Sequence, residues 1–356
     1  MQFGSDNQTG CAQQVLDALV AANRGHSHGY GHDPWTSRAV DALREVFETD
    51  LDAFFVTTGT AANCLALSNL VQPWQVIVSH VQSHIAMDES TAPEFFSGGA
   101  RVQGLGFGQG KLTADLLQDY LARMGKEFPH NAQPGALSIT QATECGLVYS
   151  PAEIAQLAQC AHAHAMHVHM DGARFSNALV SQGCSPADLT WRAGVDVLTL
   201  GASKNGCLAA EAIIVFRKEL VPGMQERRKR SGHLLSKGRF LGAQMLAWLD
   251  NGLWLNLARH ANQKAAELAR RLATVPTLSL AWPVQANEIF VIMPRATYEH
   301  LERQGAECYE WYPDALPDGS TLAHDETFVR LVCSFATTQE HLDELMSQLQ
   351  QASQKP

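Results

Sequence analysis

Several features that would assign this chain to a compartment are missing from its sequence. No apolar run approaches the length that spans a membrane, and residues 1–7 lack the charged-then-apolar layout of a signal peptide. The eight cysteines are scattered without any CxxC spacing. In a chain of this length, that scatter indicates reduced, mostly buried thiols. We therefore expect a cytoplasmic protein.

The sequence also lacks long runs of one charge and the common nucleotide-binding motifs. Its net charge of −10 is spread along the chain, so nothing resembles a nucleic-acid footprint. The one basic cluster, Arg227–Arg230, lies in a helical context and suits a phosphate or a partner subunit better than a duplex. Neither a GxGxxG motif nor a Walker loop indicates a dinucleotide or ATP site.

What is present is an alternation of strand and helix patterns, in a chain of 356 residues that is long enough for two domains. Short apolar runs predict strands at Ala53–Val56, Gln75–Ser79, Ala136–Thr140, Val168–Met170, Val195–Leu200 and Ala212–Phe216. Helical periodicity predicts helices at Ala61–Leu70, Thr113–Met124 and Pro151–Ala165. The alternation indicates an α/β fold with a mainly parallel sheet, whose ligands bind at the carboxyl ends of the strands.

The pattern changes after residue 217. A basic and then apolar segment ends near residue 251, and an Ala/Leu/Arg-rich helix follows as far as Ala273. From Leu278 the order is strand, strand, helix, strand, strand, helix. We interpret residues 31–250 as the large domain and residues 251–356 as a smaller α+β domain. Residues 1–30 are irregular and rich in glycine and histidine, and we expect them to line a site.

Two of the predicted strands end near hydroxyl or histidine side chains. Thr58, Gly59 and Thr60 join a strand to a helix. Such residues at a helix N-terminus suit a phosphate, although a plain N-cap has the same pattern. His84 follows the strand that ends at Ser79, and an imidazole there can stack on an aromatic ring or exchange protons near neutral pH.

Two further strand ends carry charged groups. Asp171 ends an apolar strand, where a carboxylate needs a cation, either Arg174 or a protonated pyridine nitrogen. Lys204 follows a predicted strand and has small neighbours. A lysine amine in a desolvated cleft can lose its proton and attack a carbonyl. The alternative is an ordinary solvated lysine in a loop. A phosphate cradle, a stacking histidine, a carboxylate and an amine are the contacts that pyridoxal 5′-phosphate (PLP) needs. We therefore predict PLP as the cofactor.

The motifs at these strand ends resemble those of the low-specificity L-threonine aldolases, which are fold-type-I (aspartate-aminotransferase-like) PLP enzymes of the β-eliminating-lyase group. The resemblance covers nearly the whole chain, and the Asp-Gly-Ala-Arg and Ser-Lys motifs are its most specific part. It runs through Ser5-Asp6-Asn7, Tyr30-Gly31-His32-Asp33-Pro34, Thr58–Asn63, Ser83-His84, His169–Phe175, Ser203-Lys204 and Val329–Val332. It implies a PLP-binding large domain and a smaller C-terminal domain.

The resemblance implies a set of cofactor contacts. Lys204 would form a Schiff base with PLP, Asp171 would bind the pyridine nitrogen, and His84 would stack on the ring. Thr58–Thr60 would hold the phosphate, and Arg174 would lie beside both cofactor and substrate.

The resemblance also implies substrate contacts and an assembly. The substrate carboxylate would be gripped by three residues: Ser5, Arg174 and Arg330. Tyr30 would lie near the substrate. Arg230 and Lys237 would complete the phosphate site of a neighbouring subunit, in a homotetramer built as a dimer of dimers.

One departure from the family pattern concerns the base. Where the family commonly has Glu-Asn-Thr-His, this chain has Gln141-Ala142-Thr143-Glu144. A histidine near the substrate hydroxyl is thus replaced by Glu144. Either His84 or Glu144 could act as the base, and Glu144 could instead be a carboxylate of the wall with no part in the chemistry.

The sequence therefore predicts a lyase that splits a carbon–carbon bond. Its reaction would be retro-aldol cleavage of L-threonine, L-allo-threonine or related β-hydroxy-α-amino acids, such as phenylserine, to glycine and an aldehyde. Another PLP-dependent β-eliminating lyase or an aminotransferase is an alternative on the same fold. Alternatives of another class are a metal-dependent hydrolase or metal-binding protein using the His162–Asp171 stretch. A non-catalytic binding protein is the last alternative, although it would be free to lose Lys204.

Overall fold

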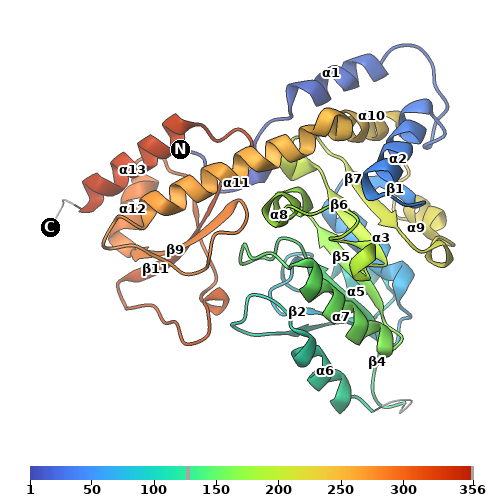
Figure 1. The fold of residues 1–356 in the computed structure, drawn as a ribbon, viewed down its shortest axis with the longest axis horizontal. Helices are drawn as coiled ribbons and strands as arrows, with labels where there is room; N and C mark the ends of the chain where they lie inside the picture. The colour runs from blue at the N-terminus through green and yellow to red at the C-terminus, as the bar shows by residue number, and fades with distance from the viewer. Residues whose placement is uncertain (126–128, 354–356) are drawn as a thin grey trace.

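A long helix, α11 (Leu253–Leu272), joins a large α/β part of the molecule to a smaller part (Figure 1). The computed structural model describes residues 1–125 and 129–353. Successive residues of the large sheet face two separate hydrophobic cores: Val76 and Val78 belong to one, and Ile77 to the other. This alternation is expected of a strand that is buried on both faces.

The large sheet has seven strands in the order β1-β7-β6-β5-β4-β2-β3. Their bounds are β1 Asp52–Val56, β2 Gln75–His80, β3 Arg101–Leu105, β4 Gln133–Thr140, β5 His167–Gly172, β6 Val197–Gly201 and β7 Glu211–Val215. From β6 to β3 all neighbours pair in parallel, whereas β7 is antiparallel to both β1 and β6. The predicted α/β fold with a mainly parallel sheet is therefore confirmed, and all six predicted strands occur with shifted ends.

One strand, β3, was absent from the sequence prediction. It lies at the edge of the sheet and pairs only with β2 among the described strands. Its sequence, Arg-Val-Gln-Gly-Leu, contains no apolar run, and none of its residues is fully buried. An edge strand needs fewer apolar residues than a central one, so the pattern that predicts buried strands is missing here.

Helices cover both faces of this sheet. The predicted helices occur as α3 (Gly59–Leu70), α6 (Ala114–Arg123) and α7 (Pro151–Ala163). Helix α7 begins with a capping box between Ser150 and Glu153, which satisfies free backbone N–H groups of its first turn. The other helices of the large part are α2 Pro34–Phe47, α4 His84–Met87, α5 Ala92–Phe96, α8 Phe175–Gln182, α9 Met224–Arg230 and α10 Arg239–Leu249. Short 3-10 turns occur at Asp6–Gln8, Trp191–Ala193, Ser203–Asn205, Lys218–Leu220, Asp250–Gly252 and Pro313–Ala315.

The prediction that the first thirty residues are irregular is wrong. Residues Gln13–Ala22 form helix α1, which lies against α10 (Figure 1). Leu16 and Val20 on α1 are exposed, so the helix does not show the separate polar and apolar faces that a sequence pattern detects.

The smaller part contains a four-stranded antiparallel sheet in the order β10-β11-β9-β8. Its elements are β8 Ser279–Leu280, β9 Glu288–Pro294, α12 Arg295–Arg303, β10 Tyr309–Glu310, β11 Glu326–Val332 and α13 Gln339–Ser353, in the predicted order. Phe3 is buried in the core of this part, and its carbonyl accepts a hydrogen bond from the Val332 N–H at 2.8 Å. The domain boundaries at residues 30 and 250 stay predictions. No helix in the described ranges is long and apolar enough to cross a membrane.

Candidate active site

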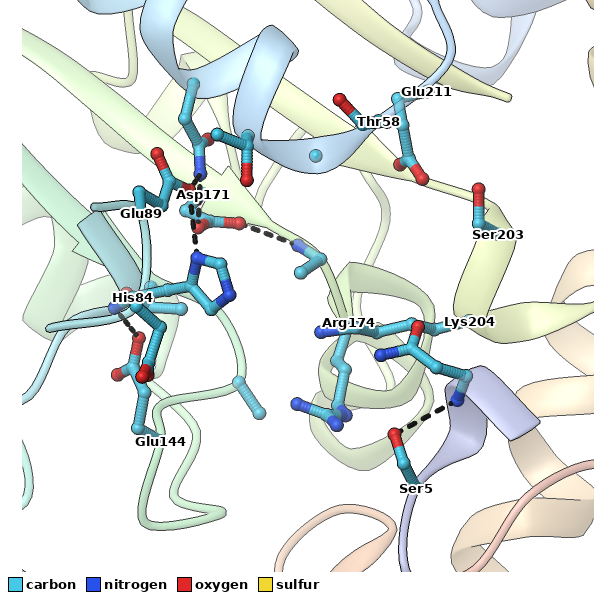
Figure 2. Close-up of a pocket in the computed structure, with 18 of the residues that line it drawn as sticks. Ser5, Thr58, His84, Glu89, Glu144, Asp171, Arg174, Ser203, Lys204 and Glu211 are labelled. Carbon is cyan, nitrogen blue, oxygen red and sulfur yellow. Dashed lines mark hydrogen bonds and ion pairs between the residues drawn. The ribbon is translucent and has the colours of Figure 1, made fainter. Parts of the chain in front are cut away.

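A cavity of about 520 Å³ opens at the carboxyl ends of the central strands. Many residues predicted for the site line it: Ser5, Thr58, Gly59, Thr60, His84, Glu144, Asp171, Arg174, Lys204 and Arg330. Figure 2 shows His84 and Glu144 on one side of this cavity and Arg174, Lys204 and Ser5 on the other. Parallel strands end at one edge of a sheet, which is why residues distant in sequence meet here.

Two glycines let the ends of β5 and β6 approach each other closely. A Cβ atom at Gly172 would lie 2.7 Å from the Thr199 carbonyl oxygen, and one at Gly201 would lie 2.7 Å from the Ala173 Cα. Any side chain would force the strands apart. These glycines flank the segments that carry Asp171 and Lys204, so the close approach brings the two charged groups to one cavity.

Lys204 lies in the 3-10 turn that follows β6. Burial lowers the pKa of its amine, and the positive charge of Arg174 lowers it further, while the carboxylates of Asp6 and Asp171 oppose both. A lowered pKa increases the fraction of neutral amine, which is the nucleophilic form. The alternative of a solvated loop lysine does not fit this environment.

Asp171 is 3% exposed, and both of its carboxylate oxygens accept hydrogen bonds. Oδ2 accepts from the Asn63 side-chain amide at 2.8 Å, and Oδ1 accepts from the Ala173 N–H at 3.0 Å. Arg174 is not its partner. The Arg174 guanidinium instead donates to both carboxylate oxygens of Asp6, at 2.7 and 2.9 Å, so the local Asp171–Arg174 pair considered from the sequence is wrong.

Thr58 is the N-cap of helix α3, and its side-chain oxygen accepts a hydrogen bond from the Ala61 N–H at 3.1 Å. The N-cap interpretation of this motif is therefore correct. It does not conflict with anion binding, because the first N–H groups of the helix and its positive dipole end border the same cavity. A Cβ atom at Gly59 would meet nothing within 4 Å, so this stretch of the wall is open.

His84 and Glu144 contact each other through the backbone. The His84 N–H donates to Glu144 Oε1 at 2.6 Å, and the His84 ring contacts Glu89 through Nδ1, at 2.8 Å from Oε1 (Figure 2). The hydrogen bond to Glu89 raises the pKa of His84 against the opposing effect of burial, and the charge of Asp171 adds to the rise. Burial and the Asp171 charge raise the pKa of Glu144 to about 7. The second oxygen of Glu144, Oε2, is buried without a partner among the described residues.

The two arginines predicted to bind a carboxylate lie together beside a buried acid, Glu288. Arg174 Nη1 is 3.3 Å and Arg330 Nη1 is 3.6 Å from Glu288 Oε1. The Arg330 guanidinium also lies over the Trp311 ring, 4.2 Å from its centre, and donates to the Gly4 carbonyl at 3.2 Å. Stacking and charge pairing hold both guanidinium groups at the wall of the cavity.

Comparison with known proteins shows the family to which the chain belongs. Residues 2–296 match the family model described as beta-eliminating lyase. The chain is 40% identical, over 97% of its length and 95% of the relative's length, to the low specificity L-threonine aldolase of Pseudomonas aeruginosa. The chain belongs to the beta-eliminating lyase family. The relative from Escherichia coli, also named a low specificity L-threonine aldolase, is 25% identical over 75% of this chain and 78% of its own length.

Solved structures place this lyase in the same fold. The threonine aldolase of Leishmania major superposes with a TM-score of 0.90 at 27% identity, covering 98% of each chain. The serine palmitoyltransferase of Sphingomonas wittichii superposes with a TM-score of 0.71 at 16% identity, over 99% of this chain and 87% of that one, which shows a shared fold alone. The predicted fold-type-I architecture is confirmed.

Three predicted site residues of the lyase do not line this cavity. Tyr30 is 48% exposed and lies under the Lys229 ammonium group, which is 5.2 Å from the ring centre. Arg230 is the last residue of α9 and Lys237 follows it in a loop, and both are exposed. Their predicted roles toward the substrate and a neighbouring subunit stay predictions.

Sequence reasoning missed several acidic and amide residues of the site. They are Asp6, Asn63, Glu89, Glu211 and Glu288, all buried and all, except Asp6, lining the cavity. Glu211 and Glu288 each begin an otherwise apolar strand, β7 and β9. A carboxylate at the start of a buried strand is costly without a partner, and this signal could have identified both. Burial raises the pKa of Glu211 to about 7, while its Oε2 accepts from the Ala202 N–H at 3.1 Å.

The histidines of the stretch considered as a metal site do not converge on one point: His162 and His167 lie near Asp196, and His169 lies elsewhere. His162 on α7 contacts the Asp196 carboxylate at 3.0 Å, whereas His169 on β5 lies between the hydroxyls of Ser138 and Thr199. No group of three or more metal-ligating side chains occurs in residues 1–125 and 129–353. The contacts of these histidines are accounted for by the fold, and they do not favour the metal-dependent alternative.

Proposed function

We propose that this lyase cleaves L-threonine, L-allo-threonine and related β-hydroxy-α-amino acids, phenylserine among them, to glycine and an aldehyde. The observation that carries the proposal is the meeting of Lys204, Asp171 and two arginines in one cavity, in a chain 40% identical to L-threonine aldolases over nearly its whole length. The cofactor for this chemistry is PLP, which draws electrons from the bond broken at the substrate Cα.

The residues of the cavity fit PLP. Burial and the charge of Arg174 lower the pKa of the Lys204 amine, which increases its neutral fraction, so it would bind the cofactor aldehyde. The buried Asp171 carboxylate has hydrogen bonds but no ion-pair partner among the described residues, so it would bind the protonated pyridine nitrogen. The start of α3, Thr58–Thr60, would hold the phosphate, and the His84 ring would lie against the cofactor ring.

Arg330 would bind the substrate carboxylate most directly. The Arg174 Nε and Nη2 groups are already occupied by Asp6, which leaves Arg174 only its Nη1 edge. The Arg330 guanidinium makes no such two-pronged contact: its ion pair among the described residues is with Glu288, whose Oε1 is 3.6 Å from Nη1. The Ser5 hydroxyl oxygen accepts from the Asn7 N–H, so its own hydrogen remains available for a carboxylate oxygen.

Glu144 would take the proton of the β-hydroxyl group. Its Oε1 is fixed by the His84 N–H, its Oε2 has no partner among the described residues, and the residue lines the cavity. A pKa of about 7 suits a base that works near neutral pH. His84 is less suited, because the adjacent carboxylates raise its pKa and favour its protonated form.

We also propose that the active form is a cytoplasmic homotetramer in which neighbouring subunits share their sites. Arg230 and Lys237 lie outside the cavity of their own subunit and are exposed, as residues that reach into a neighbour would be. Tyr30, with its ring half exposed, would lie near the substrate of a neighbour for the same reason.

The direct test is product analysis of the purified protein with PLP on L-threonine, L-allo-threonine and phenylserine. We expect glycine and the matching aldehyde in equal amounts, and a visible absorption band that borohydride removes. Lys204→Ala should lose both turnover and the band. Pyruvate or another keto acid with ammonia, and no aldehyde, would instead indicate β-elimination or amino-group transfer. Absence of any product from all three substrates would reject the proposal.

A further inference from the structure

A chain of hydrogen bonds links the ring of His84 to the carboxylate of Asp171 through two residues without an assigned role. Glu89 Oε1 contacts His84 Nδ1 at 2.8 Å and accepts from Asn63 Nδ2 at 2.9 Å. The same Asn63 nitrogen donates to Asp171 Oδ2 at 2.8 Å. The two groups predicted to contact the cofactor ring, one on its face and one at its nitrogen, are therefore connected inside the protein (Figure 2).

The Asn63 amide matches this arrangement in its number of hydrogens. An amide nitrogen carries two, and Asn63 directs one to each carboxylate. The reversed amide would place its oxygen against two carboxylates, so the hydrogen bonds determine its orientation. In this orientation Asn63 Oδ1 is buried without a partner among the described residues, a cost that local packing alone does not explain.

Glu89 is held at both of its oxygens by neighbouring residues of α3. Oε1 accepts from Asn63, and Oε2 is 3.8 Å from the thiol of Cys64. The Glu89 side chain has no exposed surface. A buried carboxylate held in this way can fix the direction of a partner ring, because it has little freedom to move.

The contact to Nδ1 leaves the other ring nitrogen of His84 facing the cavity. Within the described residues, His84 Nε2 has no hydrogen-bond partner. The charged groups that act on this ring are Glu89, Asp171 and Lys204. A carboxylate bound to Nδ1 keeps the hydrogen on that nitrogen and orients the ring, as a carboxylate does for a catalytic histidine in a triad.

We propose that Glu89 is a positioning residue that orients the His84 ring against the cofactor, and that Asn63 couples this orientation to Asp171. The inference rests on the proposed function, because it takes His84 and Asp171 as the two contacts of the PLP ring. Glu89 itself would touch neither cofactor nor substrate. Its effect would pass through His84 Nδ1.

The test compares Glu89→Gln in two backgrounds, the wild-type holoenzyme and a His84→Phe holoenzyme. Phenylalanine keeps an aromatic ring but has no Nδ1 for Glu89 to bind. In the wild-type background we expect kcat to fall about tenfold with KM unchanged, from the loss of one charge-assisted hydrogen bond. We also expect the pH midpoint of the bound-PLP visible band to fall by about one unit, because a negative charge near the ring favours its protonated forms.

In the His84→Phe background, Glu89→Gln should leave kcat unchanged and should shift the pH midpoint by clearly less than in the wild-type background, because only the direct effect of the lost charge remains. If Glu89→Gln changed kcat and the pH midpoint equally in both backgrounds, its role would be purely structural and the proposal would be overturned. The proposal would also be overturned if Glu89→Gln changed neither quantity in the wild-type background. The matched control is Glu94→Gln, since Glu94 lies on nearby α5, outside the cavity, and should leave both readouts unchanged. If Glu89→Gln does not fold, Glu89→Asp replaces it. This variant keeps the negative charge on a shorter side chain, which no longer meets His84 Nδ1. We therefore expect kcat to fall while the pH midpoint of the visible band stays unchanged.

The band titration needs no substrate and so separates this inference from the proposed function. If the wild-type enzyme bound PLP but released no glycine from any β-hydroxy amino acid, the proposed function would fail. The shift in the band on Glu89→Gln, and the reduction of that shift in the His84→Phe background, would still decide whether Glu89 acts through His84.

Discussion

At the scale of single residues, the two oxygens of Glu144 lie in different surroundings. Oε1 accepts the His84 N–H at 2.6 Å, and Oε2 is buried without a partner among the described residues. An unpaired buried acceptor destabilises the fold unless something else binds it. In the proposed reaction, the hydroxyl of the substrate would be that partner. The histidine that the family commonly has at this position could accept the proton of the substrate hydroxyl with a ring nitrogen instead of a carboxylate oxygen.

Replacement of Glu144 should therefore lower the activity and also remove the decline of activity at acidic pH (the acidic limb of the pH–rate profile). A base must be deprotonated to work, so activity of the wild-type enzyme should decline as pH falls below about 7, the pKa of Glu144. In Glu144→Gln we expect kcat on L-threonine to fall by about 100-fold, the size of a typical general-base contribution, and that acidic limb to disappear. Rates measured from pH 5.5 to 9 test both. A variant that keeps the limb at the same pH would assign the base to another group.

At the scale of elements, the start of α3 combines a helix cap with a stretch of the cavity wall, and the two can be tested separately. Thr58 caps the helix, and the same turn borders the cavity. Thr113 caps α6 in the same way, accepting from the Leu116 N–H at 3.2 Å, but lies away from the cavity. The two threonines thus form a natural pair for comparison.

Thr58→Ala and Thr113→Ala should each lower the free energy of unfolding by about 1 kcal/mol, the usual effect of losing an N-cap. Only Thr58→Ala should also weaken PLP binding, because only that hydroxyl borders the cavity. Urea unfolding of the apoenzymes measures the first effect, and equilibrium dialysis of PLP measures the second. Equal PLP affinity in the two variants would contradict a phosphate contact by Thr58.

At the scale of the whole molecule, the N-terminal segment ties the two parts of the chain together at the site. Asp6 accepts hydrogen bonds from Arg174 in the large part and from Asn287, at 3.1 Å, in the smaller part. The charges of Arg174 and Lys204, with the hydrogen bonds from Arg174 and Asn287, outweigh burial and lower the pKa of Asp6. Burial of an acid normally has the opposite effect, so the ion pair dominates here.

Asp6→Asn should destabilise the protein by about 3 kcal/mol near pH 7, because it removes one partner of a buried ion pair. The folded pKa of Asp6 is depressed, so its stabilising effect is present above about pH 4 and is lost as pH falls through the folded value. The free energies of unfolding of wild type and variant, measured in urea, should thus differ less at acidic pH than near pH 7. Asp17→Asn, an exposed position on α1, is the control. If the difference in free energy of unfolding did not depend on pH, the stabilisation would not come from the charge of Asp6.

Shared sites in the assembly can be tested by complementation between two inactive variants. Lys204→Ala lacks the amine, and the double variant Arg230→Ala, Lys237→Ala lacks the basic pair. In a co-expressed and tag-purified hybrid, one site per dimer would contain both wild-type parts, so about half of the wild-type activity should return. A Lys204→Ala homo-oligomer is the control. An inactive hybrid, or a double variant that is fully active by itself, would contradict the shared site.

Local sequence was sufficient to predict six of the seven strands of the large sheet and several residues at its carboxyl edge. Buried parallel strands are short apolar runs, and their order along the chain predicts a common edge. Lys204 and Asp171 could be identified because each follows such a run directly. The edge strand β3 and helix α1 escaped prediction because β3 lacks an apolar run and α1 mixes apolar with polar residues on its exposed side.

The tertiary structure alone decided which charges pair. Arg174 could not be matched to Asp6 from the sequence, because 168 residues separate them and Asp171 is a nearer candidate. Glu89 and Asn63 become important only when α3 and the loop after α4 meet beside β5. Pairing of buried charges depends on distances across the fold, which local patterns do not contain. The sequence by itself determined which residues follow the buried strands, and the packing of distant segments decided how their side chains are held.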